Sequence, residues 1–124
     1  MKIVFAADGS ACTKKALAFL VNHQNLAGAD DELFVCNVQP LLPPSVALMV
    51  RSEAANDSHR HPIRYRCDWV VGSSAAEIVG ATRREQAHMI VMGTHGHGLL
   101  GRIVMGSVAQ RVVADCDVPV LLVK

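Results

Sequence analysis

The sequence has no charge excess of either sign: 12 Lys and Arg residues stand against 11 Asp and Glu residues, for a net charge of +1. Nucleic-acid-binding domains usually carry a clear basic excess, so this balance argues against that class. The chain also lacks an apolar run close to the ~20 residues that a transmembrane helix needs. Its first residues are strand-like and do not resemble a signal peptide, so we expect a cytoplasmic protein.

Cysteine and histidine motifs at metal-binding or redox spacing are also absent. No C-x-x-C motif occurs, and in a cytosolic chain free buried thiols are much more common than disulfides, so we expect thiols. His59 and His61 in HRH could hint at a metal, but a solvated loop is the favoured interpretation. The cysteines concerned are Cys12, Cys36, Cys67 and Cys116.

Short apolar runs recur along the 124 residues, 51 % of which are hydrophobic. A chain of this length can bury one core, so we expect residues 1–124 to form a single domain. Ile63–Gly72 alternates apolar and polar residues, which is typical of a strand at the edge of a sheet. The strands predicted from these runs are Lys2–Ala7, Glu32–Val38, Ile63–Gly72, His88–Gly93 and Val118–Lys124.

Helical periodicity fills most of the intervals between these runs. One predicted helix starts near Ser10 and ends before Gly28, a second runs from Ser73 or Ser74 to about Ala87, and a last one ends near Asp115. Val46–Asn56 follows a proline-rich stretch and predicts only a short helix. Strands that alternate with helices predict a Rossmann-like, three-layer α/β fold, in which an open sheet of five parallel strands has helices on both faces. The residues expected on the apolar sides of these helices are Ala16, Leu17, Leu20 and Val21, then Ala76, Ile78, Val79 and Thr82, then Val104, Val108, Ala109 and Val112.

Glycine is concentrated in VMGTHGHGLLGRIVMGS, residues 91–107, after the fourth predicted strand. Its GHGLLG fits the dinucleotide-binding pattern G-x-G-x-x-G, but no acidic residue about 20 positions later lies where a ribose would need it. A P-loop requires Lys and then Ser or Thr after its last glycine, and here Arg102 and Ile103 follow, so the P-loop interpretation fails. The glycines could also serve only a tight strand-to-helix connection.

A different set of glycines gives the interpretation that we favour. Gly93 and Gly96 allow the backbone to approach a ligand closely, because neither has a Cβ. Gly106 and Ser107 are placed at the start of the last helix, where free N–H groups and the helix dipole attract an anion. Residues 86–114 contain no Asp or Glu. Together these features predict a phosphate-binding clamp.

With this spacing, G-x2-G-x9-G-S, the chain resembles the nucleotide-binding members of the universal stress protein family. AADGS after the first strand, MIVMGTHGHG around the fourth and GSVAQRVV with VPVLLVK at the end also match the family. The similarity covers nearly the whole chain except about 41–60, which is shorter than in the family and interrupted by prolines. It implies an adenine nucleotide α-hydrolase-like fold and binding of ATP, ADP or AMP, with Mg²⁺ as an optional partner.

The resemblance also implies positions for the site. It places Asp8 beside the ribose and adenine, the backbone near Val38 at the adenine edge, and Met92 close by. His95, His97 and Arg102 are added as phosphate contacts on grounds of charge alone. The complete predicted binding set is Ala6, Ala7, Asp8, Val38, Met92, Gly93, His95, Gly96, His97, Arg102, Gly106, Ser107 and Val108.

The closing apolar run and the lack of a catalytic base lead to two further expectations. An unprotected edge strand invites pairing, so we expect Val118–Lys124 to pair with its copy in a homodimer, as in similar proteins; Pro119 and Lys124 could instead protect the edge. ATP hydrolysis needs a positioned water or base, and none is evident. We therefore expect a stress-response or signalling module that binds nucleotide without a catalytic residue. A slow ATPase and a ligand-free dimeric interaction module remain alternatives.

Overall fold

The computed structural model describes residues 1–7, 11–23, 30–38, 64–70, 74–94 and 106–124. Within these ranges no helix combines the length and the apolar character needed to cross a membrane. The elements, in chain order, are β1 (Lys2–Ala7), α1 (Ala11–Asn22), β2 (Glu32–Val38), β3 (Arg64–Val70), α3 (Ser74–Arg84), β4 (Met89–Gly93), α4 (Ser107–Asp115) and β5 (Val120–Val123).

The five strands form one parallel sheet in the order β3-β2-β1-β4-β5, which confirms the predicted fold class. β3 lies at an edge, as its alternating sequence predicted, and its Arg64 and Arg66 are exposed. Chain order reverses at β1, because β2 lies on one side of it and β4 on the other. The carboxyl ends of β1 and β4 are therefore neighbours, and open α/β sheets bind their ligands at such a reversal.

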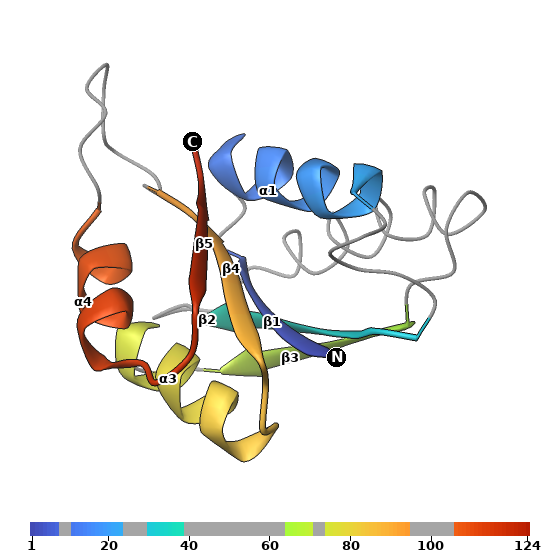
Figure 1. Ribbon diagram of the computed structural model, residues 1–124. Coiled ribbons are helices and arrows are strands. Elements are labelled where there is room, and N and C mark those ends of the chain that lie inside the picture. Colours follow the sequence, from blue (N-terminus) through green and yellow to red (C-terminus); the bar gives the residue numbers. More distant parts are fainter. Residues whose placement is uncertain (8–10, 24–29, 39–63, 71–73, 95–105) are drawn as a thin grey trace.

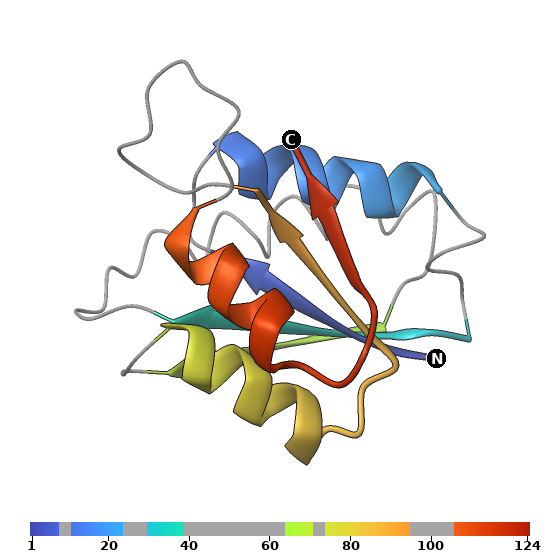
Figure 2. The ribbon, with the colours of Figure 1, turned by 60° about the vertical axis from the view of Figure 1, so that its left-hand side comes forward.

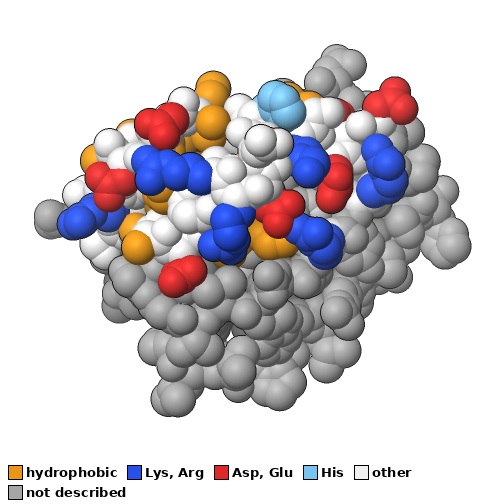
Figure 3. All heavy atoms as spheres, turned by 90° about the horizontal axis from the view of Figure 1, so that it is seen from below, with side chains coloured by type: hydrophobic (Ala, Val, Ile, Leu, Met, Phe, Trp, Pro, Cys, Tyr) orange, Lys and Arg blue, Asp and Glu red, His pale blue; other side chains and the backbone are white. Residues whose placement is uncertain are grey.

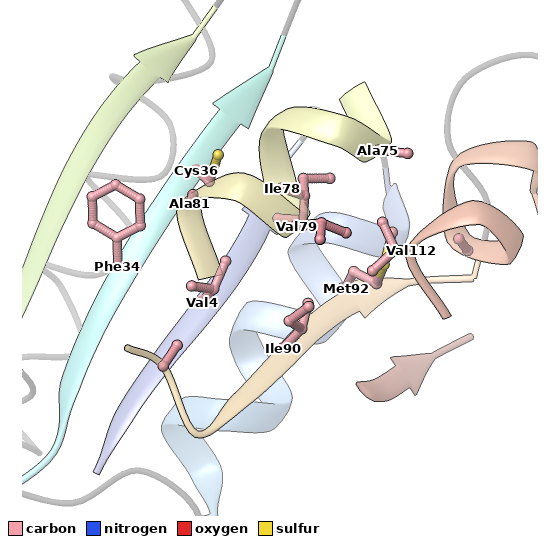
Figure 4. Packing of buried hydrophobic residues seen from close by; sticks show 13 residues of the cluster. Val4, Phe34, Cys36, Ala75, Ile78, Val79, Ala81, Ile90, Met92 and Val112 are labelled. Atoms are coloured by element: carbon pink, nitrogen blue, oxygen red, sulfur yellow. The ribbon is translucent and has the colours of Figure 1, made fainter. Parts of the chain in front are cut away.

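Helices cover both faces of the sheet (Figures 1 and 2): α1 lies on one face, and α3 and α4 lie on the other. Successive side chains of β1 point to opposite faces of the sheet, so they pack in two separate clusters. Ile3 and Phe5 pack in one buried cluster with Leu20 of α1, whereas Val4 packs in the cluster on the opposite face. Figure 4 shows this second cluster, to which Val112 of α4 also belongs. A strand buried on both faces explains why β1 is apolar from Ile3 to Ala7.

The helix α3 ends at Arg84, three residues before the predicted end at Ala87. Gln86 adopts a left-handed backbone with φ of 52°. The N–H of Ala87 donates to the carbonyl of Thr82 at 3.0 Å and that of Gln86 to Arg83 at 3.2 Å, the bonds that close a helix after a left-handed residue. Ala87 is buried outside the helix, so the apolar pattern continued past the helix end.

Other differences between prediction and structure are small. On the apolar side of α3, Ala75 is buried, whereas the predicted Ala76 is exposed. The prediction was wrong because the apolar periodicity cannot distinguish two adjacent alanines. β5 starts at Val120, two residues later than predicted, after Pro119, which has no N–H to donate to a neighbouring strand. Cys36 and Cys116 are free thiols. The predicted helix at 46–56, the segment 41–60 and Val104 lie outside the described residues.

Candidate ligand-binding site at the carboxyl edge of the sheet

The first part of the site is formed by the last residues of three adjacent strands. Ala6 of β1 is in register with Met92 of β4, and Ala7 is in register with Asn37 of β2. Ala6, Ala7 and Met92 are buried. The side chains of Ala6 and Met92 belong to the core cluster beneath α3 and α4, where Figure 4 shows Met92 beside Val112. These two residues thus help to build the floor on which a ligand would lie.

The second part is a joint between the end of β4 and the start of α4. The N–H of Gly106 donates to the carbonyl of Thr94 at 2.6 Å, and the N–H of Thr94 donates to Val123 of β5 at 2.9 Å. Thr94 is buried. The first bond brings Thr94, the residue after Gly93, next to Gly106, although twelve residues separate Gly93 and Gly106 in the sequence. The two ends of the predicted clamp therefore meet in space.

The start of α4 provides the anion-binding chemistry. Gly106 precedes the helix with an extended backbone (φ −64°, ψ 159°), and its carbonyl accepts the first helical bond, from Gln110 at 3.0 Å. The N–H groups of Ser107, Val108 and Ala109 therefore have no acceptor within the helix. Ser107 is exposed, and the first turn contains no acidic residue. Donors without an acceptor in the helix and the positive end of the helix dipole at one point favour a phosphate group.

A polar side chain that the sequence analysis did not single out lies at the same edge. Asn37, the penultimate residue of β2, is only 5 % exposed, and neither its Oδ1 nor its Nδ2 has a hydrogen-bond partner. The signal for it was an amide inside the otherwise apolar run LFVCNV. Buried polar groups in folded proteins are almost always paired, so an unpaired carboxamide at a ligand edge marks a candidate contact.

The structure describes only part of the predicted binding set. Val38 ends β2, and its backbone is in register with Val70 of β3. Among the described residues, no three His, Cys, Asp or Glu side chains gather in a way that could hold a metal ion. Asp8, His95, Gly96, His97 and Arg102 lie outside the described residues.

Comparisons with known proteins identify the family. The profile of the universal stress protein family matches residues 1–124, and the chain belongs to this family. Universal stress protein MJ0531 of Methanocaldococcus jannaschii is 30 % identical over 99 % of this chain and 81 % of its own length.

Solved structures show the same fold. Hypothetical protein MJ0577 of the same organism superposes with a TM-score of 0.79 at 25 % identity, covering 99 % of this chain and 94 % of that one. The universal stress protein from Archaeoglobus fulgidus, solved in complex with dAMP, superposes with a TM-score of 0.73 at 22 % identity, covering 100 % and 98 % of the two chains.

Proposed function

We propose that this chain binds an adenine nucleotide across the carboxyl edge of the sheet, with the phosphates at the start of α4 and the base toward β2. The observation that carries the proposal is the hydrogen bond from Gly106 to Thr94, which ties the end of β4 to the start of α4. Backbone donors fixed in this way need no rearrangement to receive a phosphate. The dAMP complex of the Archaeoglobus fulgidus protein supports an adenine nucleotide as the ligand.

ATP, ADP and AMP all fit this proposal, with or without Mg²⁺. The roles assigned to Asp8 and Val38 on the adenosine side, and to His95, His97 and Arg102 on the phosphate side, remain predictions. In the same proposal Gly93, Gly96, Gly106, Ser107 and Val108 surround the phosphates. Residues 1–124 act as one cytoplasmic domain in a stress response.

We infer that the module binds nucleotide without efficient turnover. Residues 86–114 include both halves of the clamp and contain no Asp or Glu that could serve as a base there. Phosphoryl transfer to water requires a group that positions the water and charge that neutralises the γ-phosphate. A slow ATPase is the alternative, and it predicts phosphate release by the purified protein that Ser107→Ala abolishes.

We also propose a homodimer through β5. This strand lies at the edge of the sheet, and its Leu121, Leu122 and Val123 are only half-buried. Two such strands can pair about a two-fold axis and extend the sheet across both copies. Sedimentation velocity at micromolar concentration should give twice the mass of one chain, and a monomer throughout that range would contradict the dimer.

Titration calorimetry with ATP, ADP, AMP and GTP tests the nucleotide site. We expect adenine nucleotides to bind the wild type and Gly106→Val to weaken them at least about 10-fold, since branched side-chain atoms then stand where a phosphate approaches. The backbone angles of Gly106 suit other residues, so the variant should fold. Gly80→Ala in α3 is the control, because among the described residues the added Cβ would meet the Arg84 side chain at 3.6 Å, an ordinary van der Waals distance. No heat from the wild type at millimolar nucleotide would refute the proposal.

A further inference from the structure

The proposed phosphate site and the open edge of the sheet are connected through the backbone of Thr94. Its carbonyl accepts from the N–H of Gly106 at 2.6 Å, and its N–H donates to the carbonyl of Val123 at 2.9 Å. Gly106 precedes the first turn of α4, and Val123 is the last residue of β5. Two hydrogen bonds on one residue therefore join the start of α4 to the end of the edge strand.

The backbone groups of β5 point alternately toward β4 and toward the open edge, as in any parallel pair. The N–H of Ile90 donates to the carbonyl of Pro119 at 2.9 Å, so the odd-numbered residues of this segment face β4. The even-numbered residues Val120, Leu122 and Lys124 therefore direct their N–H groups outward. These outward groups are the ones that a second copy of β5 would use.

The hydrogen bond from Thr94 orients one of these outward groups. The carbonyl of Val123 and the N–H of Lys124 belong to the same peptide group. A trans peptide group is planar, and its C=O and N–H point in opposite directions. Because Thr94 holds the carbonyl of Val123 on the side of β4, the N–H of Lys124 is aimed at the open edge.

Side-chain packing joins the same two elements. Val108 in the first turn of α4 and Leu122 of β5 are both half-buried, and both pack against the core cluster that contains Met92. Leu122 is also in register with Met92. Figure 4 shows Met92 beside Val112 of α4 in this cluster. Close-packed interiors transmit displacements, so the position of α4 and that of β5 depend on each other.

These connections give a bound phosphate an effect on the edge strand. A phosphate held by the first N–H groups of α4 restrains that turn, and the bonds of Thr94 extend the restraint to the end of β5. Ordering of surface segments is one of the main costs of association between proteins. A ligand that has already restrained the strand removes part of this cost, so pairing becomes more favourable.

Building on the nucleotide site and the β5 dimer proposed above, we propose that nucleotide binding strengthens the pairing of β5 with a second copy of the chain, and that Thr94 is the positioning residue that couples the two. Linkage requires the converse as well: the dimer binds nucleotide more tightly than the monomer does.

The dissociation constant of the wild-type dimer tests the coupling. Sedimentation velocity over a dilution series measures it with and without saturating ATP, and calorimetry on the same preparation shows independently whether ATP binds. We expect ATP to lower the dimer constant about 10-fold, which is within the usual range of coupling between sites. Since two sites share this effect, ATP should bind each site of the dimer about 3-fold more tightly than it binds the monomer.

Lys124 offers a matched pair of variants, because its side chain is exposed and only its backbone N–H enters the coupling. Lys124→Pro removes this N–H, Lys124→Ala keeps it, and both remove the ammonium group. The extended backbone of Val123 suits a following proline. Lys124→Ala should retain the ATP-induced tightening of the dimer. Lys124→Pro should lose most of it, while its monomer binds ATP with wild-type affinity.

Each contrary outcome refutes a different part of the proposal. A dimer constant that ATP leaves unchanged or raises overturns the coupling, while nucleotide binding still stands. A wild type that stays monomeric with and without ATP refutes the β5 dimer together with the coupling. Absence of ATP binding refutes the proposed function as well. These three tests need no variant. An equal response of Lys124→Pro and Lys124→Ala overturns the role of Thr94.

Discussion

The end of the sheet at which the strands begin, here called the amino edge, differs from the carboxyl edge, at which they finish. The difference is in how the polar groups find hydrogen-bond partners. At the amino edge, neighbouring elements satisfy one another: the N–H of His88 donates to Lys2 at 2.8 Å, and the Nδ1 of His88 accepts from the N–H of Lys2 at 3.1 Å. Arg66 pairs there with Glu85. At the carboxyl edge, the first N–H groups of α4 have no acceptor within the helix, and the buried amide of Asn37 has no hydrogen-bond partner.

Charge follows the same division. The face seen from below in Figure 3 carries positive and negative side chains side by side among the described residues. One such pair in the structure is Arg83 and Asp117, whose guanidinium and carboxylate lie 3.3 Å apart. The stretch 86–114, which supplies the carboxyl-edge clamp, has no acidic residue. The polar groups named at the amino edge are therefore paired within the fold, whereas the carboxyl edge is where we propose that an anionic ligand binds.

The largest expected effect is at Ser107, where a carboxylate should raise the stability of the protein and lower its affinity for ATP. Ser107→Asp places a negative charge at the positive end of α4, which should stabilise the protein by about 0.3–1 kcal/mol. The same charge should weaken ATP at least about 10-fold, because it repels the phosphates. Thermal unfolding and calorimetry on one preparation measure both quantities.

Ser107→Asn is the matched neutral control. Its gain in stability and its loss of ATP affinity should both be smaller than those of Ser107→Asp. If Ser107→Asp binds ATP as tightly as the wild type, then the start of α4 does not hold the phosphates and the contrast between the two edges is lost.

A moderate effect is expected at the amino edge, from Arg66. Arg66 pairs with Glu85, and its guanidinium carbon lies 4.8 Å from the centre of the Phe34 ring. Both partners are partly exposed, so Arg66→Ala should lower the free energy of unfolding by about 1 kcal/mol. Urea titration measures this loss, and nucleotide affinity should stay unchanged. Arg66→Lys keeps the charge but not the planar group, so it should recover only part of the loss. A change in ATP affinity would show that the two edges are coupled.

The smallest effect is expected at the turn after α3. Gln86 holds a left-handed backbone that glycine adopts without strain, so Gln86→Gly should stabilise the protein by about 0.5–1 kcal/mol. Gln110→Gly, in the regular helix α4, is the opposite control and should destabilise by a similar amount. Equal signs for the two substitutions would contradict the role of the left-handed turn.

The sequence predicted the strands well because each signal is local. ELFVCNV and MIVMG are apolar runs that only a doubly covered strand accommodates, and both were confirmed. The end of α3 was predicted too late, because Ala87 is buried although the helix has already ended at Arg84. For the site, the spacing of Gly93, Gly106 and Ser107 predicted the clamp. Asn37 was missed because one amide in an apolar run does not reveal whether it has a partner.

By itself the sequence determined the alternation of strands and helices, the apolar faces that bury the sheet, and the glycine spacing that indicates the family. These follow from the period of side chains along a helix or strand and from the conformational freedom of glycine, which act over a few residues. Only the tertiary structure decided which ends of strands and helices lie next to each other. The strand order puts Ala7 beside Asn37, and the hydrogen bond from Gly106 to Thr94 joins the end of β4 to the start of α4. Such contacts between residues distant in the chain depend on how all the strands assemble.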